Sequence, residues 1–210
     1  SSGSVVVTNF CSGQCPQDGP CSPPTTSAVL PAADCTFVFM NTLSMPSFSI
    51  IDSTYAYNLT FTSMSDAFVT WTGGQVRLAS AGIISFVNFN GDLPNVRLSA
   101  RRVYFYLSKF SFSSGFTFNS QDTMDIEVLY SQFTNTTDGS DLFAITAGDS
   151  TTTSFTAYSS VFRSSSSVLV FTSSNGTLSN VQFQSATVTA KYFLAGNNPA
   201  LTTLITGGTF

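Results

Sequence analysis

Charged side chains are scarce in this chain of 210 residues. Only 9% of the residues are Asp, Glu, Lys or Arg, whereas a typical globular protein has about 25%. The formal net charge is −4, and nucleic-acid binding requires clustered Lys and Arg instead. The sequence therefore excludes nucleic acid as an expected partner.

Histidine is absent, and the chain has a single glutamate, Glu127. Two acidic groups stand out, the first made by Asp122, Asp125 and Glu127 and the second by Asp138, Asp141 and Asp149. A carboxylate pair could support glycoside hydrolysis, and neighbouring aspartates could bind calcium; the alternative is that all of them are solvated turn residues. Without histidine, a lysine-rich groove or a repeated aspartate ladder, the sequence predicts no catalytic residue, no metal site and no cofactor, in a protein that is not an enzyme.

Long apolar runs are also lacking. No run approaches the length of a transmembrane helix, and Ser1 begins no signal peptide. We therefore expect no membrane span, in a chain that is either a processed mature form or a segment of a longer protein. No stretch shows a sustained 3.6-residue period with helix caps.

Hydroxyl side chains replace charge as the polar component. The chain has 34 Ser and 28 Thr, residues that suit the outside of strands and turns. Apolar and polar residues alternate in segments 76–78, 96–98, 103–107 and 126–128, as in half-buried strands. With 42% hydrophobic residues, the chain can bury a substantial core. These features predict an all-β protein.

Phenylalanine, with 21 copies, returns at the ends of short β-rich phrases. The phrases end at Phe10, Phe39, Phe61, Phe89, Phe112, Phe133, Phe162, Phe183 and Phe210. The intervals are 29, 22, 28, 23, 21, 29, 21 and 27 residues, with a mean of 25. A period in this range is typical of stacked-repeat proteins.

A right-handed parallel β-helix of about eight coils explains this repeat, because three short strands and three turns consume about 25 residues. A sandwich or barrel would also have many short strands, but it would not need the same phrase nine times. Phenylalanines in corresponding places should form an internal aromatic stack; the alternative is an external platform for carbohydrate. The expected core stack contains Phe61, Phe89, Phe133, Phe162 and Phe183.

Two short motifs add a resemblance at the level of the fold. Gly207-Gly-Thr-Phe210 and Phe116-Thr-Phe-Asn119 resemble the Gly-Gly and Phe-x-x-Asn signatures of secreted right-handed β-helix proteins of the pectate-lyase-like and polymorphic-outer-membrane-protein-like families. The resemblance covers residues 36–210 as an architecture. It implies the fold and carries over no catalytic residue.

All four cysteines, Cys11, Cys15, Cys21 and Cys35, lie near the N-terminus in a proline-rich stretch. The three-residue gap between Cys11 and Cys15 would suit zinc, but no histidine is present and the other spacings are loose. We expect two disulfides, with the pairing open, and an oxidising compartment. The predicted organisation is a disulfide-stapled segment with the first coil over 1–35, followed by the β-helix over 36–210.

Three N-x-[ST] sequons, at Asn58, Asn135 and Asn175, agree with an extracellular or cell-surface protein. We expect glycans on them, with Asn58 pointing outward from a strand whose Leu59 and Phe61 point inward. The alternative is an unmodified asparagine in a turn or ladder.

Arg77 and Arg97 each lie between a valine and a leucine. The shared pattern predicts that the two arginines lie one above the other on successive coils, as an outward ladder or a partner contact.

The two ends of the sequence suggest an assembly. Strand-like phrases carry Val5, Val7 and Phe10 at one end and Leu204 and Phe210 at the other. Compatible open ends can stack head to tail into a homopolymer, because a heterologous contact propagates. The predicted function is therefore an extracellular structural protein, the subunit of a head-to-tail filament. The alternatives are a surface adhesin or passenger segment, a glycan-binding or ice-binding module and, with less support, a polysaccharide-active enzyme.

Overall fold

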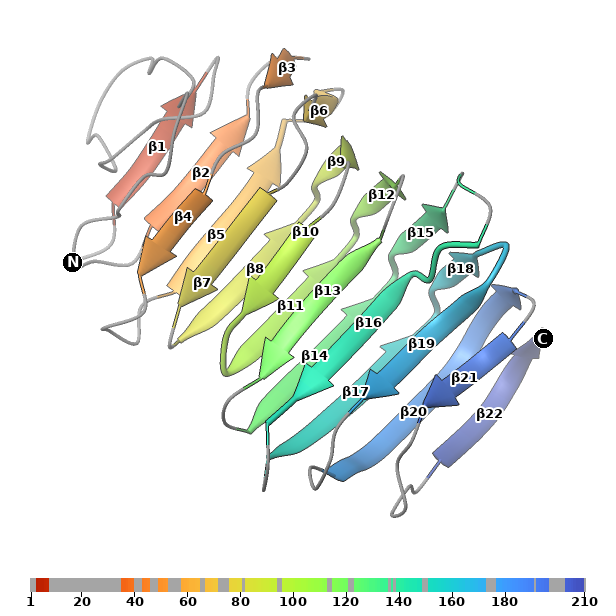
Figure 1. Ribbon diagram of the computed structural model, residues 1–210. Helices are drawn as coiled ribbons and strands as arrows, with labels where there is room; N and C mark the ends of the chain where they lie inside the picture. Colours follow the sequence, from red (N-terminus) through yellow and green to blue (C-terminus); the bar gives the residue numbers. More distant parts are fainter. Residues whose placement is uncertain are drawn as a thin grey trace.

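The chain forms an all-β parallel solenoid, with no helix among the residues described (Figure 1). The computed structural model describes residues 3–7, 35–39, 43–45, 49–52, 58–64, 67–71, 76–80, 82–93, 96–112, 115–120, 123–135, 137, 139–148, 151–172, 177–190, 192–196 and 203–209.

The described strands form three faces, and strands of successive turns pair in parallel. The first face contains β1 (Gly3–Val7), β2 (Cys35–Phe39), β5 (Asn58–Ser63), β8 (Ile83–Val87), β11 (Arg102–Tyr106), β14 (Met124–Leu129), β17 (Thr152–Tyr158) and the first halves of β20 (Thr177–Thr189) and β22 (Thr203–Thr209). The second half of β22 pairs with the second half of β20.

The second face continues from the first around a corner, and the third closes the turn. The second face contains β3 (Leu43–Met45), β6 (Val69–Trp71), β9 (Asn90–Leu93), β12 (Lys109–Phe112), β15 (Gln132–Asn135), β18 (Val161–Arg163) and the second half of β20. The third face contains β4 (Ser49–Asp52), β7 (Val76–Ser80), β10 (Val96–Ser99), β13 (Phe116–Ser120), β16 (Phe143–Ala147), β19 (Ser167–Thr172) and β21 (Tyr192–Gly196).

Alternation decides which side chains enter the core. In β11, Val103 and Phe105 are fully buried, whereas Tyr104 and Tyr106 point outward. The same in–out pattern holds in β5, β8, β14 and β17. The period-two segments of the sequence are therefore strands, as predicted.

A left-handed residue makes the corner between the first and second faces. Asn88, Leu107, Tyr130, Ser159 and Ser185 occupy this place in successive turns, with φ between 46° and 52°. The backbone NH of each corner residue from Asn88 to Ser159 donates to a carbonyl of the next turn, for example Leu107 to Leu129 at 3.1 Å. The corner therefore bends the chain and keeps the turns in register.

A buried serine ladder follows the corner. The backbone NH of Ser108 donates to Oγ of Ser131 at 3.1 Å, and that of Ser131 donates to Oγ of Ser160 at 3.0 Å. Each of these hydroxyls also donates to the carbonyl two residues before it. The ladder thus supplies partners for backbone groups that the bend removes from the strand pairing.

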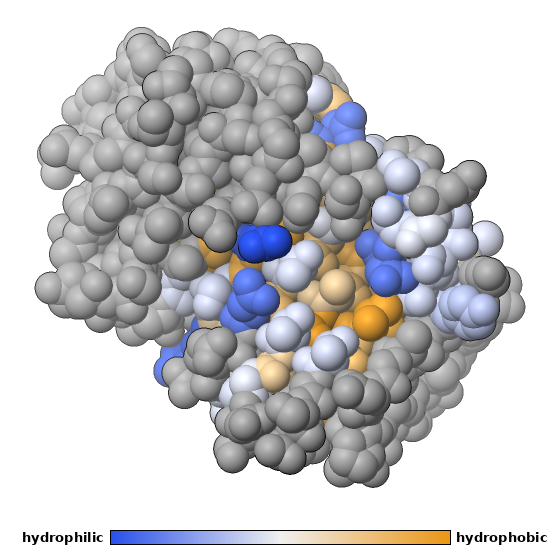
Figure 2. All heavy atoms as spheres, in the orientation of Figure 1, coloured by the Kyte–Doolittle hydropathy of each residue, from blue (hydrophilic) through white to orange (hydrophobic). Residues whose placement is uncertain are grey.

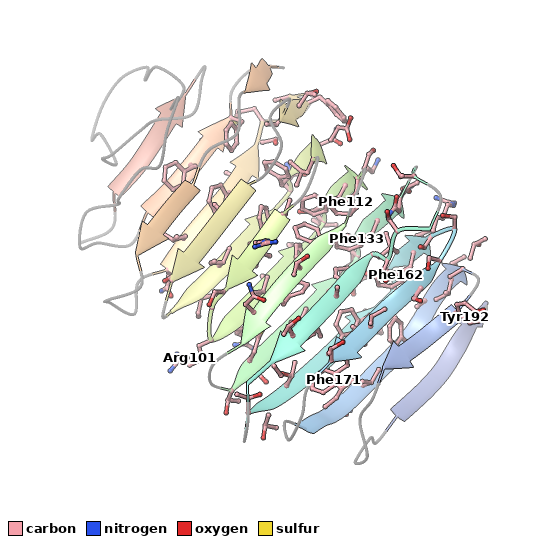
Figure 3. All side chains as sticks on the ribbon, in the orientation of Figure 1. Arg101, Phe112, Phe133, Phe162, Phe171 and Tyr192 are labelled. Carbon is pink, nitrogen blue, oxygen red and sulfur yellow. The ribbon has the colours of Figure 1, made fainter. Side chains whose placement is uncertain are left out.

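The five phenylalanines expected to form one stack are all buried, but they do not share one register. Phe61 and Phe183 lie on the first face, Phe133 and Phe162 lie on the second, and Phe89 follows the corner. In Figure 3, Phe133 and Phe162 follow Phe112 along the axis of the solenoid. The expectation of a single stack is therefore corrected to two columns. The first column is Phe37, Phe61, Phe86, Phe105, Val128, Ala157 and Phe183, and the second is Gly91, Phe110, Phe133, Phe162 and Val188.

The ring of Phe89 fills the place in the second column that Gly91 leaves empty. Gly91 is the strand position that pairs with Phe110, but a Cβ there would lie 2.8 Å from the ring of Phe89 and 2.7 Å from the carbonyl oxygen of Val69. The Phe89 ring instead stacks on Phe110, with centroids 5.5 Å apart. In the next turn the phenylalanine lies in the strand, at Phe110, and the small residue Ser108 directly follows the corner.

Four successive turns of the solenoid, β8–β10, β11–β13, β14–β16 and β17–β19, are described strand by strand, with the burial of nearly every side chain. The count of about eight coils and the right-handed sense stay predictions. Cys11, Cys15 and Cys21 lie outside the described residues, and Cys35 is described only as the first backbone position of β2. The two disulfides therefore also stay a prediction.

Candidate binding face

An exposed aromatic cluster lies on the outside of the first face. It consists of Tyr104, Tyr106, Leu107, Tyr130 and Tyr158, which we call the tyrosine face. It contains four of the seven tyrosines of the chain. Leu107 and Tyr130 are each 49% exposed, and Tyr158 is 38% exposed, although large apolar side chains usually avoid water.

Register brings these residues together from three turns. Tyr106 of β11 pairs with Leu129 of β14, which pairs with Tyr158 of β17. Leu107 and Tyr130 occupy the corner directly after β11 and β14. Because strands of one face are about 4.8 Å apart, side chains distant in the sequence form one continuous surface.

The tyrosine rings contact one another in a chain. Tyr104 stacks on Tyr106 with centroids 6.1 Å apart and an interplanar angle of 12°. Tyr130 meets Tyr106 at 6.1 Å and Tyr158 at 5.4 Å, both edge to face at 79° and 87°. These are favourable aromatic geometries, so the rings hold one another in place while remaining open to water.

Paired charges border the tyrosine face. Arg102 donates a hydrogen bond to Glu127 of the next turn and forms an ion pair with it. Asp125 accepts a hydrogen bond of 2.6 Å from the hydroxyl of Ser154. At this border the arginine is therefore ion-paired, and both carboxylates accept hydrogen bonds.

The pKa shifts follow from these contacts. The hydrogen bond to Glu127 raises the pKa of Arg102, against the lowering effect of partial burial. Partial burial raises the pKa of the Tyr104 phenol, and Tyr106 and Glu127 add to this effect. Tyr104 therefore remains a neutral hydrogen-bond donor over the physiological range.

Two rows of outward side chains cross the tyrosine face along the axis of the solenoid. The row of Tyr104 runs through Thr60, Ser85, Tyr104, Glu127, Thr156 and Gln182. The row of Tyr106 runs through Val87, Tyr106, Leu129, Tyr158 and Gln184. The predicted hydroxyl cover is thus interrupted by aromatic side chains in the middle of the first face.

The structure describes three of the six residues in the two predicted acidic groups. Asp125 and Glu127 share the outside of β14, whereas Asp141 accepts a hydrogen bond from the backbone NH of Ser167 at 2.9 Å. Asp122, Asp138 and Asp149 lie outside the described residues. Among the residues described, no group of three or more possible metal ligands comes together.

The three sequons differ in their surroundings. Asn58 is exposed at the start of β5, beside the buried Leu59. Asn135 is only 8% exposed, and its Nδ2 donates to the carbonyls of Ser140 and Asp141 at 3.0 and 3.4 Å. A glycan would replace one of these bonds, so this geometry argues against a glycan on Asn135. Asn175 lies outside the described residues.

The register confirms that Arg77 and Arg97 lie one above the other on successive turns, as predicted. Arg77 of β7 pairs with Arg97 of β10 on the third face, and Arg97 is exposed. In the coloured part of Figure 2, strongly hydrophilic side chains lie beside pale and apolar ones. In Figure 3, Arg101 extends away from the edge of the solenoid.

The predicted assembly residues lie at the ends of the first face. Val5 and Val7 belong to β1, and Leu204 belongs to β22; their backbones alone are described. Phe10 and Phe210 lie outside the described residues. Val5 is in register with Phe37, and Ile205 is in register with Phe183, so Ile205, next to the predicted Leu204, continues the first column.

Sequence reasoning missed the tyrosine face and the serine ladder. The alternation in 103–107 indicated that Tyr104 and Tyr106 point outward. The 24- and 28-residue intervals from Tyr106 to Tyr130 and from Tyr130 to Tyr158 match the repeat and could have placed these rings near one another.

The described residues include no helix that could span a membrane. Comparison of the chain with protein-family models, with curated proteins and with solved structures found no match. The parallel solenoid and its tyrosine face are therefore the observations on which a function can be argued.

Proposed function

We propose that this protein is an extracellular structural protein whose solenoids stack end to end into a filament. The observation that supports the proposal is the uninterrupted parallel pairing of the first face, from β1 to β22. Every strand of that face points the same way, so β1 of a second copy could pair in parallel with β22. Open strand edges recruit further strands.

The first column of core residues predicts how β1 of one copy would align with β22 of another. Val5 lies in register with Phe37 at one end, and Ile205 lies in register with Phe183 at the other. A copy stacked on β22 would place its Val5 beside Ile205 and continue the column. The contact is heterologous and propagates, and few charges oppose it because only 9% of residues are charged.

We place this assembly outside the cell or at its surface. The four cysteines and the sequon at the exposed Asn58 support that location, because disulfides and N-linked glycans are formed on secreted proteins. Glycans and hydroxyl side chains on the sides of the solenoid would favour end contacts over bundling.

Electron microscopy of the purified protein tests the assembly. We expect fibres whose axial repeat is about 40 Å, for about eight coils spaced by about 4.8 Å. Val5→Asp should prevent fibres by placing a charge in the junction, whereas Thr156→Asp, on the outside of the first face, should not. A folded monomer at high concentration from the unaltered chain would refute end-to-end stacking.

A second candidate is a surface adhesin or attachment module. The tyrosine face favours it, because exposed aromatic clusters on soluble proteins usually mark binding sites. This role is compatible with a filament, since the tyrosine face lies on the side of the solenoid and not at its ends.

A further inference from the structure

Two residues of the tyrosine face occupy a backbone conformation that their side chains disfavour. Leu107 and Tyr130 both have φ of 51°, a region in which bulky L-residues are strained and asparagine is tolerated. The equivalent corners of neighbouring turns carry Asn88, Ser159 and Ser185. A small polar residue therefore satisfies the fold at this position.

The core does not explain the two bulky residues, because half of each side chain remains in water. Leu107 and Tyr130 thus combine backbone strain with exposed apolar surface, and both effects disfavour folding. Strained residues that the fold does not need are typical of functional sites. We therefore infer that the tyrosine face is a ligand-binding site.

The shape and charge of the surface define that ligand. The row from Val87 through Tyr106 and Leu129 to Tyr158 crosses the strands in a straight line, one residue per turn. Such a row suits a linear polymer more than a compact partner. The only ion pair among the residues described, Arg102 with Glu127, lies at the border of the tyrosine face. The five residues of the tyrosine face include no acidic or basic side chain, so the rings themselves offer no charge to an ionic polymer.

We propose that the tyrosine face binds a neutral polysaccharide chain that lies along the axis of the solenoid. Sugar rings have apolar C–H faces and hydroxyl edges, so they match aromatic rings surrounded by hydrogen-bonding groups. Tyr106, Tyr130 and Tyr158 supply the rings, and the neutral phenol of Tyr104 supplies a donor. The hydroxyls of Thr156 and Ser85 and the amide of Gln182 continue the polar rows in both directions.

This inference gives a ligand to the second candidate function and does not depend on end-to-end stacking. Binding can therefore fail while fibres form, or succeed with a variant that forms none. The two proposals are separated by measuring retention on glycans with Val5→Asp, which leaves the tyrosine face intact.

The experiment is retention of the folded protein on insoluble cellulose, β-1,3-glucan, mannan and chitin, with cross-linked polygalacturonate as the acidic comparison. We expect retention on at least one neutral polymer, little dependence on salt, and no preference for polygalacturonate. Tyr130→Asn, which suits the corner backbone, should weaken retention about tenfold, and Tyr106→Thr with Tyr158→Thr should abolish it.

Tyr192→Ser is the matched control, because Tyr192 is 53% exposed but belongs to β21 on the third face (Figure 3). It should bind like the unaltered protein, and circular dichroism should show every variant to be folded. Failure to bind any neutral polymer, full binding by Tyr130→Asn, or a stronger response to Tyr192→Ser would overturn the proposal. So would a dimer that Tyr130→Asn disrupts, because it would make a second copy the occupant.

Discussion

The inside and the outside of the first face use aromatic residues for different purposes. In β11, Phe105 faces inward and is fully buried. Its ring centroid lies 5.3 Å from that of Phe86 and 5.6 Å from that of Phe110. Its neighbours Tyr104 and Tyr106 face outward on the same strand and remain partly exposed. The phenylalanine rings contact one another, and so do the tyrosine rings. Only the phenylalanines are fully removed from water. We therefore expect the buried phenylalanines to supply most of the hydrophobic stabilisation of the fold. The tyrosines remain accessible to a ligand.

The corner residues add a second contrast. On the inner side of the bend, Ser131 engages the backbone of two turns through its hydroxyl. On the outer side, the adjacent Tyr130 has a strained left-handed backbone and is 49% exposed. Adjacent residues of one corner therefore have opposite effects on stability.

Truncation of an inner ring should have the largest effect. Phe133 lies 5.2 Å from Phe110 and 5.6 Å from Phe162, nearly parallel to both. Phe133→Ala should lower the free energy of unfolding by about 3–5 kcal/mol because a cavity replaces the ring. Urea denaturation measures the change, and Tyr158→Ala, the matched outer substitution, should cost less than about 1 kcal/mol. Equal losses would remove the contrast between the two sides.

Loss of a serine hydroxyl from the ladder should have an intermediate effect. Ser131→Ala leaves the buried NH of Ser108 without its acceptor, which should cost about 1–3 kcal/mol. Ser111→Ala, on the outward side of β12, is the control and should change stability by less than about 0.5 kcal/mol. Identical unfolding curves for the two variants would show that the ladder does not stabilise the corner.

Relief of strain at the corner should have a small effect of opposite sign. Tyr130→Asn replaces a disfavoured left-handed residue by a tolerated one and should raise stability by up to about 1 kcal/mol, less the loss of ring contacts with Tyr106 and Tyr158. Thermal unfolding with and without a bound neutral glycan checks the result. A clear loss of stability would mean that Tyr130 is needed for the fold.

The smallest effect should come from the phenol of Tyr104. Its pKa is raised in the folded protein, so the folded state holds this proton more tightly than the unfolded chain, where the pKa is about 10. The resulting stability is complete below pH ~10 and is lost as the pH rises through the folded pKa. Tyr104→Phe should therefore reduce the fall in stability above pH ~10, as followed by denaturation at several alkaline pH values. An unchanged pH profile would contradict this reasoning.

The sequence predicted the strands because alternation is a local property. The apolar residues of 103–107 and 126–128 point inward as their period requires. The repeat likewise predicted a solenoid, since a period near 25 residues suits three strands and their turns.

Register could not be predicted, because it depends on contacts between turns. Phe89 takes the space above Gly91, and Phe112 pairs with Asn135 and not with Phe133, so equal spacing did not mean equal position. The sequon at Asn135 shows the same limit, since the hydrogen bonds that engage its amide come from a loop whose path the motif does not specify. The tyrosine face was missed because Tyr106 and Tyr158 lie in the strand row while Tyr130 lies at the corner.

The central claim is that the inner phenylalanines stabilise the fold and that the outer tyrosines serve binding. The most direct test is the free energy of unfolding of the triple variant Tyr106→Thr, Tyr130→Asn and Tyr158→Thr. Because these outer side chains remain partly exposed, the variant should unfold within about 1 kcal/mol of the unaltered protein, far from the loss expected for Phe133→Ala alone. A loss as large as that of Phe133→Ala would show that the outer tyrosines hold the solenoid together, and it would contradict the claim that they are kept for binding.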